Sequence, residues 1–127
     1  MINALFVTSE KTGLSRLENF FKNSDVNTFR SETGNIALSI ISDTVFDLVV
    51  IDENLPDMTG LQLAAQLITK NPMINCALIS SLSPEDYHEK SEGLGLIMQL
   101  PPDPKEEDGE ELLNKLNTIL NLTKRVD

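Results

Sequence analysis

This sequence is poor in residues on which several classes of protein depend. Its 127 residues include one cysteine, Cys76, one histidine, His88, and no tryptophan. One cysteine excludes an intramolecular disulfide, and a lone histidine without a cysteine pair excludes a structural zinc site. Cys76 opens a short apolar run, which is typical of a small buried core residue in a reducing compartment.

Basic residues are also scarce. Ten Lys and Arg stand against twenty Asp and Glu, for a formal net charge of −10, and the basic residues are scattered. Nucleic acids and anionic membrane surfaces require clustered Lys and Arg, so we expect neither as a partner. No apolar run approaches the roughly 20 residues that span a bilayer, and residues 1–7 lack the features of a signal peptide. A cytoplasmic location is therefore expected.

Short apolar runs and helical stripes alternate along the chain. The runs at residues 4–7, 26–30, 45–51, 76–79 and 96–98 predict strands. Apolar stripes at spacings of three and four predict helices that begin near Leu14, Gly34, Leu61 and Leu112, while Ser83-Pro84 is typical of a helix start. This alternation predicts one doubly wound α/β domain over residues 1–127, with a five-stranded parallel sheet and helices on both faces.

The most informative segment is the apolar run 48–51, which ends at Asp52 and is followed by a loop containing Pro56 and Gly60. In open α/β sheets, binding and reaction sites form at the carboxyl ends of the strands. We therefore expect Asp52 to belong to a site. Ser9 and Ser80 have no general base at a recognisable spacing, so a hydrolase triad has no support and no enzyme is expected.

The order of elements and the run 52–60 (Asp-x-x-Leu-Pro-Asp-Met-x-Gly) resemble the receiver domain of two-component response regulators. Ser80 after the fourth strand and Pro101 after the fifth extend the resemblance, which covers residues 3–122. It implies a flavodoxin-like (βα)5 fold in phosphorelay signalling. It also implies a histidine kinase or another signalling protein as the partner, with a homodimer as an option.

In that family, Asp52 would accept a phosphoryl group and Ser80 would supply a neighbouring hydroxyl. Asp52 and the backbone carbonyl of Asn54 would bind Mg²⁺, which takes hard oxygen ligands. The family also places an acidic pair after the first strand, a Lys before the proline at Pro101, and an aromatic residue on the fifth strand.

This sequence departs from the family at those last three places. The acidic pair is replaced by Thr8-Ser9, with Glu10 as the next carboxylate, the Lys by Leu100, and the aromatic residue by Ile97. Two carboxylates of a metal site and one cation are therefore missing. A carboxylate that attacks a phosphorylated histidine needs such charges to offset the repulsion between two anions.

Three interpretations follow. The first is a degenerate receiver that works through protein contacts, with weak or no phosphorylation. The second is a working phosphoacceptor in which Glu10 joins Asp52 in binding Mg²⁺. The third is a flavodoxin-like protein that binds a cofactor phosphate in the hydroxyl-rich loop 8–15, although Glu10 would repel a phosphate and the aromatic content is only 5%.

Two local expectations concern the segment after the fifth strand. The resemblance implies a cis peptide bond before Pro101, with the Leu100 side chain placed over the pocket beside Asp52. We also expect a loop over residues 102–109 before the last helix begins.

Overall fold

In the described part of the chain, five short strands form one parallel sheet in the order β2-β1-β3-β4-β5. The computed structural model describes residues 2–9 and 14–125, apart from the side chains of residues 122–125. All residues of the central strand β3 are buried, because helices cover both faces of the sheet. The strands are β1 (Asn3–Val7), β2 (Asn27–Ser31), β3 (Leu48–Ile51), β4 (Cys76–Ile79) and β5 (Leu96–Leu100).

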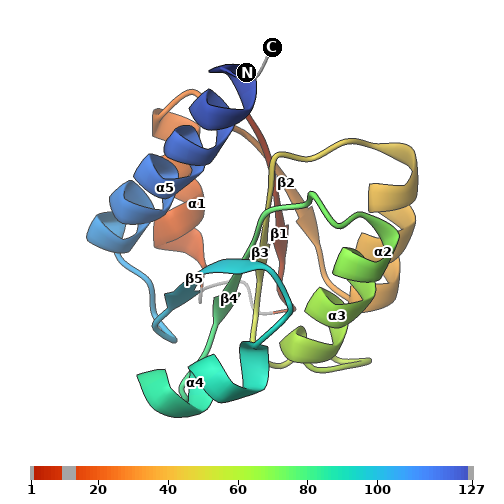
Figure 1. Ribbon diagram of the computed structural model, residues 1–127. Coiled ribbons are helices and arrows are strands. Elements are labelled where there is room, and N and C mark those ends of the chain that lie inside the picture. Colours follow the sequence, from red (N-terminus) through yellow and green to blue (C-terminus); the bar gives the residue numbers. More distant parts are fainter. Residues whose placement is uncertain (1, 10–13, 126–127) are drawn as a thin grey trace.

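The helices lie on both sides of the sheet (Figure 1). In the described residues they are α1 (Ser15–Asn23), α2 (Gly34–Asp43), α3 (Gly60–Lys70), α4 (Pro84–Ser91) and α5 (Glu106–Arg125). α1 and α5 pack together on one face, and α2 and α3 on the other, while α4 lies at the end of the molecule where β4 ends. This arrangement confirms the predicted doubly wound five-stranded α/β fold.

Each face of the sheet has its own core, and β1 contributes to both. Phe6 points toward α1, where its ring centroid lies 5.7 Å from that of Phe21. Leu5 and Val7 point the other way, toward α2 and α3. Successive side chains of a strand alternate between faces, so one apolar run fills both cores. The two cores hold the carboxyl ends of β1, β3 and β4 in fixed register.

Polar side chains cap the helices that follow the loops after β3 and β4. Thr59 accepts a hydrogen bond from the backbone N–H of Gln62, whose side chain accepts from the Thr59 N–H. This capping box begins α3 directly after the loop that follows β3. Ser83 accepts from the N–H of Asp86 ahead of Pro84, which confirms the predicted start of α4.

The expected loop over residues 102–109 is too long, because α5 already begins at Glu106. The Asp108 carboxylate accepts a hydrogen bond of 2.9 Å from the Lys105 N–H and stabilises this first turn. Gly109 then lies against α1, where an added Cβ would come 2.7 Å from the Phe20 ring. None of the helices in the described residues combines the length and apolar composition needed to cross a membrane.

Candidate functional site

Asp52 lies at the carboxyl end of β3, beside the end of β1. Its backbone N–H donates to the carbonyl of Val7, which continues the ladder between the two strands by one residue. The Thr8 hydroxyl then donates a hydrogen bond of 2.9 Å to Oδ2 of Asp52. Asp52 is partly exposed, whereas Thr8 is fully buried. The structure therefore brings together Asp52 and one of the two residues that replace the acidic pair.

The loop after Asp52 turns sharply because Gly60 has no side chain. The Gly60 N–H donates to the carbonyl of Glu53, and a Cβ at Gly60 would lie 2.4 Å from the Asp52 carbonyl oxygen. Any larger residue would push α3 away from the end of β3. The glycine that supports the family resemblance thus has a steric role beside the candidate phosphoacceptor.

The same loop is fastened to α2 by Asp57. Its two carboxylate oxygens accept hydrogen bonds of 2.9 Å from the backbone N–H groups of Gly34 and Asn35. These bonds at the start of α2 hold the pKa of Asp57 below its usual value. This role of Asp57 was not predicted, since nothing in the sequence indicates which helix its side chain would meet.

Ser80 lies at the end of β4 and is almost completely buried. Its N–H donates to the carbonyl of Leu100, and its Oγ accepts a hydrogen bond of 3.1 Å from the N–H of Leu82. Gln99 of β5 donates to the Leu82 carbonyl at 2.9 Å. The loop between β4 and α4 is therefore held through both the N–H and the carbonyl of Leu82. Gln99 was not predicted, because its role depends on the pairing of β4 with β5.

A second anchor holds this loop from β3. Oε1 of Glu53 accepts hydrogen bonds from the N–H of Ser81 at 3.1 Å and from the Ser81 hydroxyl at 2.9 Å. Glu53 thus ties the loop after β3 to the loop after β4 through one carboxylate oxygen. This role of Glu53 was not predicted from the sequence.

A pocket of about 190 Å³ opens beside these loops. Ser80 and Asn54, both predicted from the family resemblance, lie in its wall, together with Lys90 from the end of α4. Lys90 is the cation that sequence analysis missed, because the position of α4 above the strand ends is a tertiary feature. The remaining lining residues are Glu53, Thr59, Leu61, Leu78 and Leu82.

The prediction of a cis peptide bond before Pro101 is wrong, since the described residues contain no cis peptide bond. The Leu100 side chain is fully buried in the core beneath α1 and α5, and it does not line the pocket beside Ser80. An apolar side chain gains most from burial in that core, and the trans form is the favoured one for X–Pro bonds. Pro101 itself is exposed.

Ile97 is partly exposed on β5 and packs against α5. A different aromatic residue approaches the strand, because Tyr87 of α4 donates a hydrogen bond of 3.3 Å to the carbonyl of Met98. Burial raises the pKa of Tyr87 to about 12, so its phenol stays protonated and remains a donor at neutral pH.

The described residues do not fit a bound Mg²⁺. Asp52 already accepts a hydrogen bond from Thr8, Ser9 is an exposed residue without a carboxylate, and Glu53 is bonded to Ser81. In the described ranges, no group of three or more His, Cys, Asp or Glu residues is placed to hold a metal ion. The predicted substitute Glu10 lies outside the described residues, as do residues 10–13 of the loop 8–15 assigned to a cofactor phosphate.

Comparisons with known proteins agree with this fold. The family model of the response regulator receiver domain matches residues 5–118. No curated protein matches the chain. Among solved structures, the chemotaxis response regulator CheY4 of Vibrio cholerae is 15% identical, with a TM-score of 0.82 over 91% of this chain and 98% of that chain.

Two further structures are similar over nearly the full length. A CheY-like receiver domain protein of Methanospirillum hungatei is 17% identical, with a TM-score of 0.82, and the match covers 100% of this chain and 99% of that chain. An uncharacterized protein of Neptuniibacter caesariensis is 20% identical, with a TM-score of 0.85, and covers 97% and 92%. At these identities the structural likeness concerns the fold.

Proposed function

The chain belongs to the response regulator receiver domain family, and we propose that it is a degenerate receiver that signals by protein–protein contact. In this proposal Asp52 takes up phosphate weakly or not at all, and the domain keeps one conformation without it. The domain acts in the cytoplasm as a non-catalytic module, with a histidine kinase or another signalling protein as its partner.

The observation that carries the proposal is the hydrogen bond from Thr8 to Asp52. Thr8 stands where the family supplies the first of two carboxylates for Mg²⁺. A hydroxyl gives Asp52 a donor without adding negative charge, so the carboxylate is satisfied without a cation. Phosphoryl transfer to Asp52 would need the opposite arrangement, in which acidic ligands hold a metal that neutralises the incoming phosphoryl group.

The loop between β4 and α4 supports the same conclusion. Ser80 accepts from Leu82, Gln99 donates to Leu82, and Ser81 donates to Glu53. These bonds hold the loop in place without a phosphoryl group. Leu100 stands where the family has a Lys, and its side chain is apolar and buried, so this position supplies no cation to balance a phosphoryl group on Asp52.

Intact mass spectrometry tests this proposal. The protein is incubated with acetyl phosphate and Mg²⁺, next to the Asp52→Asn variant and a phosphorylatable receiver as the positive control. We expect the unmodified mass for the wild-type protein while the positive control gains one phosphoryl group. Near-complete addition of one phosphoryl group to the wild-type protein, lost in Asp52→Asn, would overturn the proposal and favour the interpretation in which Glu10 completes a metal site.

A further inference from the structure

The pocket of about 190 Å³ beside Ser80 lies where three segments meet. They are the loop after β3, the start of α3 and the last turn of α4. Figure 1 shows the end of α4 next to the start of α3. The pocket is smaller than the roughly 300–1,000 Å³ that drug-sized molecules occupy, so it suits a small ligand.

Three leucines supply the apolar part of the lining. Leu78 of β4 is almost completely buried, whereas Leu61 of α3 and Leu82 of the loop after β4 are partly exposed. A ligand that covers these side chains removes apolar surface from water, which favours binding. The pocket therefore selects a ligand with a compact apolar part.

The same lining contains one carboxylate and one ammonium group that are not paired with each other. Glu53 and Lys90 both line the pocket, yet the one ion pair of the described residues joins Arg30 to Glu18. Oε1 of Glu53 accepts both hydrogen bonds from Ser81, which leaves Oε2 for another donor. A charge of each sign is thus available to a ligand in one small pocket.

Two hydroxyls add hydrogen-bond donors. Oγ of Ser80 accepts from the N–H of Leu82, and Oγ1 of Thr59 accepts from the N–H of Gln62. Each hydroxyl uses an oxygen lone pair in these bonds and keeps its proton for an acceptor in the pocket. Asn54 contributes an amide, which both donates and accepts. The polar part of the lining therefore suits a carboxylate beside an ammonium group.

We propose that this pocket binds a free α-amino acid with an apolar side chain of about the size of leucine. The ammonium group of the ligand meets Oε2 of Glu53, while its carboxylate meets Lys90 and the Ser80 hydroxyl. Its side chain lies against Leu61 and Leu82. A zwitterion brings one charge of each sign, whereas a monoanion or a monocation leaves one protein charge without a partner. Within a peptide an amino acid has lost these charges, so a peptide segment does not match.

Such a ligand would fasten α4 to the rest of the domain. None of the eight residues of α4 is buried, so the helix itself gains little from the core. A ligand held by Lys90 and Glu53 joins α4 to the loop after β3. Binding stabilises the bound arrangement and gives the domain an input that needs no phosphoryl group.

Titration with L-leucine into the millimolar range, followed by amide chemical shifts, tests the inference without any phosphodonor. The comparison ligands are 4-methylpentanoate, which lacks the ammonium group, 3-methylbutylamine, which lacks the carboxylate, and glycine, which lacks the apolar part. We expect saturable shifts at Asn54, Ser80 and Lys90 with L-leucine, and about tenfold weaker binding of each comparison ligand. Hydrogen exchange of the α4 amides should slow when L-leucine is bound.

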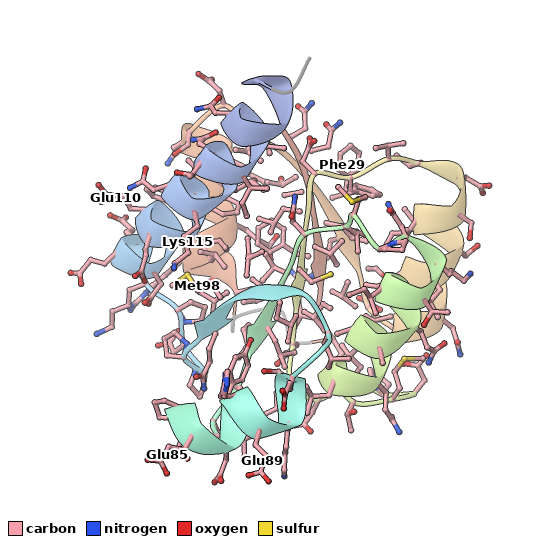
Figure 2. The ribbon with its side chains drawn as sticks, viewed as in Figure 1. Phe29, Glu85, Glu89, Met98, Glu110 and Lys115 are labelled. Atoms are coloured by element: carbon pink, nitrogen blue, oxygen red, sulfur yellow. The ribbon has the colours of Figure 1, made fainter. Side chains whose placement is uncertain are left out.

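Isosteric variants with matched controls test the two charges. Glu53→Gln keeps an oxygen for Ser81 but removes the negative charge, whereas Glu89→Gln removes one from the outer side of α4 (Figure 2). Lys90→Met keeps an apolar stem but removes the cation, and Lys115→Met does the same on α5 (Figure 2). Each pocket variant should weaken L-leucine binding about five- to tenfold, and each control less than twofold.

Three results would each overturn the inference. They are the absence of saturable shifts in the pocket, equal affinity for L-leucine and any comparison ligand, and equal weakening by a pocket variant and its control. Phosphorylation of Asp52 in the mass assay would instead overturn the proposed function. The L-leucine result does not depend on that assay, because Asp52 is not among the residues that line the pocket.

Discussion

The Thr8 hydroxyl donates a hydrogen bond of 2.9 Å to Oδ2 of Asp52, although the two residues are 44 positions apart in the sequence. The parallel pairing of β1 with β3 brings the two strand ends together. Thr8 is fully buried, and a buried hydroxyl without a partner is costly. The pair therefore stabilises the fold, and under the proposed function it takes the place of a metal site.

Removal of this hydroxyl should lower stability. Thr8→Val keeps the shape of the side chain but removes the donor to Asp52, and we expect a loss of about 1–2 kcal/mol in the free energy of unfolding. Urea denaturation measures it. Thr69→Val is the control, since Thr69 bonds the carbonyl of Ala65 on the exposed side of α3. An effect no larger than that of the control would contradict the role given to Thr8.

The fold and part of the site could be predicted from the sequence, because they depend on local patterns. The apolar run of β3 and the Pro and Gly after Asp52 indicated both the strand and the loop that follows it. The strand and its loop depend on periodicity and on turn chemistry, which neighbouring residues determine. Ser80 was predicted from the resemblance to the receiver family, which places a hydroxyl residue after the fourth strand.

The rest depends on contacts between elements that are distant in the sequence. Asp57 caps α2, Gln99 clamps Leu82, and Lys90 reaches the pocket beside Ser80 only because of how the helices pack. Leu100 was placed wrongly because the family's Lys guided the prediction. An apolar side chain at that position gains more from the core than from a polar pocket.

The Asp57 cap gives a pH-dependent contribution to stability. Hydrogen bonds from Gly34 and Asn35 lower the pKa of Asp57, so the unfolded chain takes up a proton at a higher pH than the folded protein does. The contribution of the Asp57 carboxylate to the free energy of unfolding is complete above about pH 4, the ordinary carboxyl pKa. It is lost as the pH falls through the lower pKa that Asp57 has in the folded protein.

Asp57→Ala tests this by urea denaturation across a pH series. The variant should be less stable than the wild-type protein at pH 7, and the gap should narrow as the pH falls below about 4. The exposed Asp103→Ala serves as the control. A gap between wild type and Asp57→Ala that is independent of pH would show that the carboxylate is not what caps α2.

Gly60 should tolerate no side chain. In Gly60→Ala the new Cβ would meet the Asp52 carbonyl oxygen at 2.4 Å and Leu78 Cδ1 at 2.6 Å, so backbone must move. We expect a loss of about 1–3 kcal/mol in unfolding free energy, with altered amide shifts around Asp52. Gly93→Ala is the contrast, because nothing lies within 4 Å there and the cost arises from its positive φ of 82°. Altered amide shifts around Asp52 in Gly93→Ala, without such shifts in Gly60→Ala, would contradict this account.

Cys76 should be unreactive in the folded protein. Burial raises the pKa of its thiol to about 12, so almost no thiolate, the reactive form, exists at pH 8. A thiol reagent should label Cys76 slowly in buffer and rapidly in urea, as measured by the absorbance change of the reaction. Equal rates in the two conditions would mean that β4 does not bury this side chain.

The central claim is that the Thr8–Asp52 pair replaces a metal and phosphoryl site. The most direct test measures amide chemical shifts while the protein is titrated with Mg²⁺ and then with beryllofluoride, which is a phosphoryl analogue. The Thr8→Asp, Ser9→Asp double variant, which restores the acidic pair, shows whether the loss of those acids is the cause. We predict no saturable shifts at Thr8, Asp52 or Ser80 in the wild-type protein below the millimolar range, and a response to Mg²⁺ in the double variant. Saturable shifts at these amides in the wild-type protein at micromolar Mg²⁺, followed by further changes with beryllofluoride, would contradict it.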